Sequence, residues 1–147
     1  MDKSYVIDTT SLISYFGYIF MKKPKISKNA LRFIDRAFRD DDSIKLSIPG
    51  IVFVEIFDKW FTDEENAAKI RSEMMSPIYD CPNIEVKPIE KEVLENLLKI
   101  TDEYIKLDNH DKIILASSMM LQWPLITSDS KIIKYNKKYR VIPGIIS

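Results

Sequence analysis

The sequence predicts an α/β protein, a three-layer α/β/α sandwich with a central parallel sheet. Short apolar runs alternate with longer helical segments along the whole chain, as in successive βαβ units. Residues 5–7 are apolar at consecutive positions, which is typical of a strand buried on both faces. The chain has only 3 glycines and no repeat or low-complexity tract, so the connections between elements must be short.

The first third of the chain is expected to form two strands and two helices. After the strand at residues 5–7, residues 11–20 are apolar nearly all round and predict a buried helix. Residues 22–28 predict a loop, and Ser27 or Asn29 is expected to cap the next helix. Apolar residues at helical spacing mark the inner face of that helix: Leu31, Ile34 and Phe38. Residues 44–48 then predict a strand that Pro49-Gly50 ends.

The middle of the chain predicts two helices, a loop and a strand. Residues 51–61 form a strongly apolar helical segment, and Asp63 is expected to cap a further helix that runs to Met75. Residues 77–82 contain two prolines and predict a loop. Residues 84–86 predict the third strand.

The last third predicts helix, helix, strand, short helix and strand. These elements are residues 90–104, residues 112–122 with Asp108 as N-cap, and residues 125–127, 130–135 and 140–142. The length of 147 residues suits one domain. We therefore expect residues 1–147 to form a single domain.

Composition excludes several classes of protein. The formal net charge is +0, so overall charge indicates neither a nucleic-acid nor a membrane partner. Cys81 is the single cysteine, which excludes an intrachain disulfide or a cysteine metal cluster and suits a reducing compartment. The apolar run at residues 12–21 is too short to cross a bilayer. It lacks the flanks of a signal peptide, so we expect a cytoplasmic protein.

The zero net charge hides two basic segments. Seven Lys and Arg residues face only Asp35 in residues 22–39, and residues 131–140 contain five basic residues and no acid. Charge runs of this kind are often solvated faces. The alternative is a surface that binds a polyanion. The lysines expected to contact the polyanion in that case are Lys22, Lys23, Lys25, Lys131 and Lys134.

Carboxylates follow two of the predicted strands. Asp8 follows residues 5–7, and Asp129 follows residues 125–128, at the strand ends where parallel sheets bind ligands. Each could instead serve only as the N-cap of the next helix. Asp111 lies in the first turn of a helix that Asp108 is expected to cap, so it has an equally plain interpretation as a partner of the helix dipole.

Glu55 is harder to explain structurally. It interrupts a helix whose other residues from Ile51 to Phe57 are all apolar, and a carboxylate in such a place is costly unless it is paired or binds a metal. Pairing with Lys or Arg is the plain alternative. If Asp8, Asp111 and Asp129 converge with it, their repulsion requires a cation. An all-oxygen ligand set without Cys or His favours Mg²⁺ or Mn²⁺.

The order of these motifs resembles the PIN (PilT N-terminus) domain family. The matching segments are YVIDTTSLISYF, IPGIVFVEIF, NHDKIILASSMML and WPLITSDSKI. The resemblance covers nearly the whole chain, whose size is similar to that of small stand-alone VapC-type ribonucleases. It implies a central parallel sheet, metal-dependent endoribonuclease activity on single-stranded or structured RNA, and, as a further possibility, an antitoxin partner.

The resemblance also implies roles for particular residues. Its acidic quartet corresponds to Asp8, Glu55, Asp111 and Asp129. Asp8, Asp111 and Asp129 would be metal ligands, and Glu55 would act through a water. Polar residues beside the acids would orient the carboxylates or donate to phosphate: Thr10, Ser11, Thr127 and Ser128. His110 is the only histidine; beside a helix start it is commonly a surface residue rather than a general base.

Two other classes of function remain open on the sequence. One is a catalytically silent PIN-like module that binds RNA or a protein. The other is a phosphotransfer domain with Asp8 as acceptor, although Thr10 stands where one such phosphatase family needs a second Asp. The apolar segments at residues 15–20 and 57–61 either pack in the core or bury a partner, whether a second copy in a homodimer or an antitoxin.

Overall fold

The computed structural model describes residues 3–39 and 41–147, in which five strands form one parallel sheet of order β3-β2-β1-β4-β5. The strands are β1 (Lys3–Ile7), β2 (Ile44–Pro49), β3 (Ile84–Lys87), β4 (Leu125–Ile126) and β5 (Ile145–Ile146). In the register, Tyr5 pairs with Leu46 of β2 and Ile7 with Ile126 of β4. The central strand β1 is therefore flanked by β2 and β4, and all strands end at one edge.

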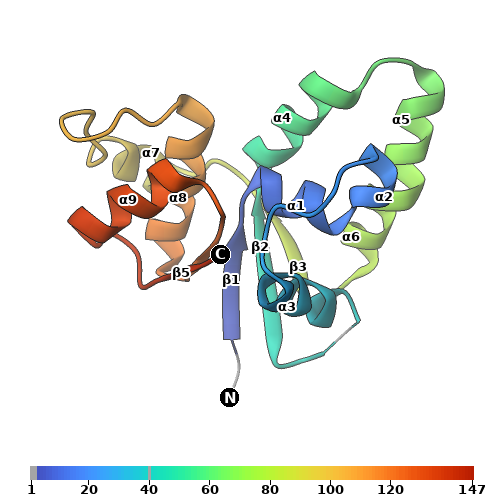
Figure 1. Cartoon of the computed structure of the whole chain (residues 1–147), viewed down its shortest axis with the longest axis horizontal. Coiled ribbons are helices and arrows are strands. Elements are labelled where there is room, and N and C mark those ends of the chain that lie inside the picture. Colours follow the sequence, from blue (N-terminus) through green and yellow to red (C-terminus); the bar gives the residue numbers. More distant parts are fainter. Residues whose placement is uncertain (1–2, 40) are drawn as a thin grey trace.

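Helices cover both faces of this sheet, as Figure 1 shows. Helices α7 (Lys91–Leu97), α8 (Asn109–Leu121) and α9 (Ser130–Tyr139) lie on one side. On the other lie α1 (Thr9–Tyr15), α2 (Gly17–Phe20), α3 (Lys28–Phe38), α5 (Glu64–Ile70) and α6 (Ser76–Asp80). Helix α4 (Gly50–Trp60) starts where β2 ends. The predicted α/β/α sandwich is confirmed.

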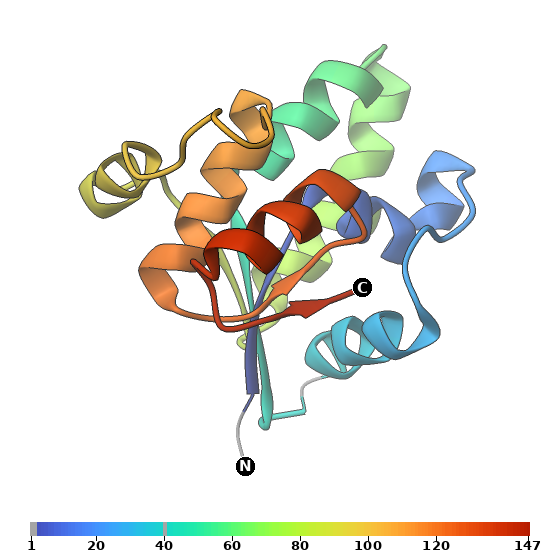
Figure 2. The same ribbon diagram turned by 60° about the vertical axis from the view of Figure 1, so that its left-hand side comes forward.

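The core consists of the sheet and the helix faces turned toward it. Val6, Ile7 and Ile48 are fully buried in the strands, and Leu12 and Leu115 cover them from opposite sides. Burial on both faces explains why β1 and β2 read as nearly continuous apolar runs. Figure 2 shows α9 over β4 and β5, whereas α8 packs against β1 and β2. Within the described residues no helix is long and apolar enough to cross a membrane.

The predicted helix at residues 11–20 is wrong in one respect, because it breaks at Phe16. Helix α1 ends at Tyr15 and α2 begins at Gly17. A Cβ on Gly17 would lie 2.4 Å from the carbonyl oxygen of Lys22, whose own N–H donates to the Gly17 carbonyl at 3.0 Å. The chain folds back onto this glycine, and a straight helix would prevent that.

Five further predictions of element bounds need correction. Residues 77–82 are not all loop, because Pro77 lies in the first turn of α6, where its missing N–H is not needed. The helix from Asp63 passes through a π-helical segment, η1 (Arg71–Met75), and continues into α6. The helix expected at residues 90–104 ends at Leu97.

The last strand lies at Ile145–Ile146, not at residues 140–142. Arg140 ends α9 with a φ of 50°, and the side chain of Asn136 accepts the Ile142 N–H at 3.0 Å. The first residues of the predicted strand are thus used to end the preceding helix. Helix α9 itself is longer than the predicted residues 130–135.

Candidate active site

Asp8 leaves the carboxyl end of β1 and caps α1. Its Oδ1 accepts the backbone N–H of Ser11 at 2.8 Å, and its Oδ2 accepts the hydroxyl of Thr127. The side chain is buried. Burial raises the pKa of the Asp8 carboxyl, and the nearby charge of Asp129 adds to this, while hydrogen bonds from Ser11 and Thr127 act in the opposite direction.

Asp129 follows β4 and caps α9. Its Oδ1 accepts the N–H groups of Lys131 at 2.8 Å and Ile132 at 3.0 Å, and its own N–H donates to Thr127 Oγ1 at 3.0 Å. Thr127 therefore connects the two acids directly. Since Ile7 and Ile126 are paired on neighbouring strands, Asp8 and Asp129 emerge side by side at the sheet edge. Both are helix caps, and each carboxylate has lone pairs left for another ligand.

Glu55 approaches these residues from α4. Its Oε1 accepts the hydroxyl of Thr9 at 2.6 Å, and its Oε2 lies 3.8 Å from His110 Nδ1. Although this helix is strongly apolar in sequence, it is not buried all round, because Val54 is 55% exposed and the Glu55 side chain 27%. Glu55 faces the partly open space between α1 and α8.

Asp111 belongs to the first turn of α8, whose N-cap is Asp108. Asp108 Oδ1 accepts the Asp111 N–H at 2.8 Å. Burial raises the pKa of Asp111 to about 7, and the charges of Asp108, Asp129, Glu55 and Asp8 contribute to the rise in that order. The charges of all these carboxylates therefore act on Asp111.

We call Asp8, Glu55, Asp111 and Asp129 the acidic centre. An open cavity of about 420 Å³ adjoins it, lined by Lys106, Asp108, Asp111, Asp129 and Lys131 among others. Among the described residues, no Lys or Arg forms an ion pair with any member of the acidic centre. The structure therefore places the four acids near enough for the charges of the other three to act on Asp111, and no described Lys or Arg is paired with them.

The donor chemistry of this centre suits a hard divalent cation. All its donors are carboxylate oxygens, the ligands preferred by Mg²⁺ and Mn²⁺. Burial first, and then repulsion by the neighbouring carboxylates, raises the pKa of Asp111, and a cation would relieve the repulsion. Within residues 3–39 and 41–147, however, no three His, Cys, Asp or Glu side chains are grouped closely enough to hold a metal ion. Binding one would require these side chains to move together.

The polar residues expected beside the acids occupy different positions. Thr127 and Ser11 contact Asp8 as described, and the Ser11 hydroxyl donates to the Ile126 carbonyl at 3.1 Å. Ser128 is half-buried at the end of β4, and Thr10 is exposed. The hydroxyl that contacts an acid from α1 is that of Thr9.

Sequence reasoning missed Thr9, and it treated Asp108 only as a cap. The contact between Thr9 and Glu55 joins residues 46 positions apart, so neither segment alone predicts it. Asp108 had a local signal, since it lies three residues before Asp111. That spacing predicts a cap, and the cap also places a further negative charge beside Asp111.

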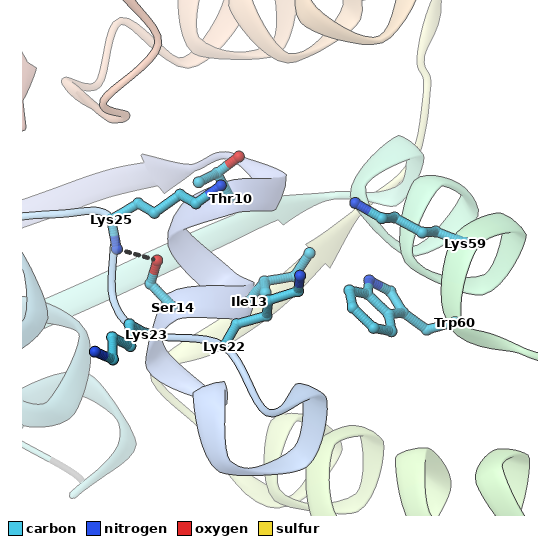
Figure 3. Close-up of a pocket in the computed structure, with 8 residues that line it drawn as sticks. All are labelled: Thr10, Ile13, Ser14, Lys22, Lys23, Lys25, Lys59 and Trp60. Carbon is cyan, nitrogen blue, oxygen red and sulfur yellow. Dashed lines mark hydrogen bonds between the residues drawn. The ribbon is translucent and has the colours of Figure 1, made fainter.

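The predicted RNA-binding lysines lie in two places. Lys131 lines the cavity of the acidic centre, and Lys134 is exposed on α9. Lys22, Lys23 and Lys25 line a separate, smaller pocket beside α1 (Figure 3).

Comparisons with known proteins agree on the fold. No protein-family model matches the sequence, and no curated protein matches it. Solved structures do match it. A chain of VapBC2 from Rickettsia felis, bound to a promoter DNA fragment, is 12% identical with a TM-score of 0.62; the match covers 98% of this chain and 97% of that one.

Two further complexes give the same result. A chain of VapBC-1 from nontypeable Haemophilus influenzae is 18% identical with a TM-score of 0.63, and the match covers 96% of each chain. A chain of a toxin-antitoxin complex from Klebsiella pneumoniae is 20% identical with a TM-score of 0.58, covering 97% of this chain and 96% of that one. At such identities the likeness shows the fold, and the PIN-like fold expected from the sequence is confirmed.

Proposed function

We propose that this chain, which has a PIN-like fold, is a Mg²⁺- or Mn²⁺-dependent endoribonuclease. The observation that supports this most directly is the acidic centre: four carboxylates from β1, α4, α8 and β4 act on one another at the carboxyl edge of a parallel sheet, and no described Lys or Arg neutralises them. Ligands bind at this edge in open α/β sheets.

In this proposal Asp8, Asp129 and Asp111 hold the cation. Bound there, Mg²⁺ or Mn²⁺ supplies an activated water and offsets charge on the scissile phosphate and the leaving oxygen. Ser11 and Thr127 hold the Asp8 carboxylate in place, and the N–H groups that bind Asp129 Oδ1 fix the direction of its free Oδ2.

Glu55 orients the attacking water. The Thr9 hydroxyl holds one of its oxygens at 2.6 Å, and the other lies 3.8 Å from His110 Nδ1. His110 is partly exposed and lies beside Glu55 beyond hydrogen-bonding distance. Lys131 and Lys134 lie on the side of Asp129, where they can hold the RNA backbone that the acids repel.

The test is cleavage of a labelled single-stranded RNA and of an RNA hairpin by the purified chain. We expect internal cuts with added Mn²⁺ or Mg²⁺ and none with a chelator. Products should carry 5′-phosphate and 3′-hydroxyl ends, because water attacks the phosphorus and the 3′ oxygen leaves; attack by the RNA 2′-hydroxyl would instead give a 2′,3′-cyclic phosphate. Asp111→Asn, purified identically, controls for a contaminating nuclease, and equal cutting by that variant would refute the proposal.

One observation favours a second candidate, a catalytically silent PIN-like module that binds RNA. No three acids of the described chain are grouped closely enough for a metal ion. Such a module would bind the same RNA with and without Mn²⁺ and would leave it intact. The cleavage assay above separates the two candidates.

We also propose an antitoxin partner, in view of the toxin-antitoxin complexes that share the fold. Residues 15–20 mostly serve the core, since Phe16, Ile19 and Phe20 are buried. Phe57 and Phe61 instead line an open apolar groove of about 450 Å³ together with Met75 and Tyr79. Phe61→Ser should weaken co-purification with the product of the adjacent gene; a homodimer at this groove would instead appear as a change in mass in solution.

A further inference from the structure

A small pocket of basic character lies beside the acidic centre (Figure 3). It is formed by α1, the loop after α2 and the end of α4, and it has a volume of about 90 Å³. We call it the basic pocket. Its lining includes Thr10, Ser14, Lys22, Lys25, Lys59 and Trp60; Ile13 and Lys23 complete the lining. The basic pocket is much smaller than the cavity beside the acidic centre.

The lysines of the basic pocket are not neutralised by the protein. Lys22, Lys25 and Lys59 form no ion pair with any acid in the described part of the chain. Lys59 follows Glu55 by four residues, the order that favours an ion pair on a helix. Glu55 instead contacts Thr9 and His110, so both charges stay available to ligands.

Two of these lysine ammonium groups lie close to the ring of Trp60. The ammonium groups of Lys22 and Lys59 lie 5.6 Å and 5.3 Å from the centre of its ring, within the range of cation–π attraction. The indole Nε1 is buried and has no hydrogen-bond partner among the described residues. An indole N–H only donates, so the pocket contains an unused donor beside its cations, as an anion site requires.

The loop that carries Lys22 and Lys25 is held in position by backbone contacts. The Lys25 N–H donates to Ser14 Oγ at 3.0 Å, and the Lys22 N–H donates to the Gly17 carbonyl at 3.0 Å. Figure 3 shows the Lys25 ammonium extended toward Thr10, whereas the ammonium of Lys23 points away from the other lysines. The loop is thus anchored to α1 and α2, and Lys23 provides a control of equal charge from the same loop.

The basic pocket and the acidic centre share two helices. On α1, Thr9 contacts the acidic centre and Thr10 lines the basic pocket. On α4, Glu55 belongs to the acidic centre, and Lys59, one turn later, lines the basic pocket. One helical turn rises 5.4 Å, so a strand whose scissile phosphate lies at the acids can place a neighbouring phosphate at the lysines. Lysine ammonium groups bind phosphate as point charges.

We infer that the basic pocket binds one backbone phosphate of single-stranded RNA next to the scissile phosphate and so determines where the strand is cut. This inference rests on the proposed endoribonuclease function. It differs from general attraction to a basic surface because it assigns three lysines and one indole N–H to a single phosphate.

The salt dependence of RNA affinity shows how many phosphates the basic pocket neutralises. For single strands, log affinity falls with log salt by ~0.7 per neutralised phosphate. RNA binding is measured across a salt series in the Asp111→Asn background, which does not cut. We expect each of Lys22→Gln, Lys25→Gln and Lys59→Gln to weaken binding by about tenfold and Lys23→Gln to have little effect.

The variant that combines Lys22→Gln, Lys25→Gln and Lys59→Gln should lower the salt slope by only ~0.7, because one phosphate is lost. A drop of ~2.1 would mean three separate phosphates, and an equal effect of Lys23→Gln would mean a diffuse basic field. Either result, or an unchanged slope, overturns the inference.

A second measurement separates this inference from the proposed function. In a cleaved RNA, phosphates are replaced one at a time by neutral methylphosphonates. One position beside the cut should weaken binding by Asp111→Asn protein and have no further effect in the variant that also lacks the three lysines. If wild type cuts no RNA, the proposed function fails; if it cuts normally and no such position exists, the basic pocket inference alone fails.

Discussion

The acidic centre and the basic pocket share α1 and α4 and hold opposite charges. The contacts that hold their charged side chains differ. The strand-end acids of the acidic centre are fixed by backbone N–H groups at helix starts, whereas the lysines of the basic pocket are held by an indole ring and a folded-back loop. Glu55 and Lys59 show that the two charges do not neutralise each other even where helix spacing would allow it. Both regions therefore keep their charge for ligands.

The largest expected effect separates catalysis from binding. Asp111→Asn and Glu55→Gln should each lower the rate of RNA cleavage by more than about 100-fold, the upper end of what even outer contacts of a metal contribute. RNA affinity should hold or rise, because a negative charge is removed. Single-turnover cleavage and a binding titration measure the two quantities. Wild-type cleavage by either variant would contradict the role of the acidic centre.

Metal binding should stabilise the protein through the acidic centre only. A cation at a hundred times its dissociation constant adds about 2.7 kcal/mol to the free energy of unfolding, or roughly 5–10 °C in melting temperature. The double variant Asp8→Asn/Asp129→Asn should lose most of this response to Mn²⁺. Lys22→Gln/Lys59→Gln should keep it, and an equal response in all three proteins would place the cation elsewhere.

A smaller effect distinguishes acids that cap helices from those that do not. Asp129→Ala should lower the metal-free free energy of unfolding by about 1 kcal/mol, because α9 loses its N-cap, and the melting temperature by ~2–4 °C. Asp129→Asn should cost much less, since Asn caps equally well. Asp111→Asn should raise metal-free stability. Thermal unfolding in chelator compares all three, and a loss with Asp111→Asn would contradict the repulsion argued here.

The smallest effect is a pH dependence at Asp111. Its pKa is raised from 3.8 to about 7 in the folded protein, so the folded state binds a proton that the unfolded state has lost between these values. Its contribution to stability is greatest below pH 3.8 and decreases as the pH rises toward 7. In chelator, the gain in melting temperature from Asp111→Asn should be larger at pH 8 than at pH 5. Equal gains would contradict this assignment.

The sequence allowed the fold and the acids of the sheet edge to be predicted, because both depend on local patterns. An apolar run followed by Asp8 or Asp129 marks a buried strand, its end and a helix cap in one short segment. The break at Phe16 was missed because its cause is a carbonyl five residues further along, against Gly17. Pro77 was taken for a loop residue because proline suits a loop and a first helical turn equally.

The basic pocket could not be predicted as a unit. Its residues come from α1, from the loop after α2 and from the end of α4, and the sequence showed only a run of lysines in one of these segments. In the sequence, Lys59 and Trp60 are only a charged and an apolar residue near the end of a predicted helix. Only tertiary packing places an indole N–H beside ammonium groups from two segments.

If Asp8 and Asp129 bind the proposed cation as well as capping helices, there is a consequence for how such chains diverge. Both carboxylates cap helices, so a descendant that no longer cut RNA would still be selected to retain them for folding. Neither Glu55 nor Asp111 caps a helix in the described chain, and the repulsion on Asp111 favours its loss once no cation is bound. In distant relatives of this chain, retention of Glu55 and Asp111 is therefore the stronger sign of an active enzyme, and retention of Asp8 and Asp129 the weaker one.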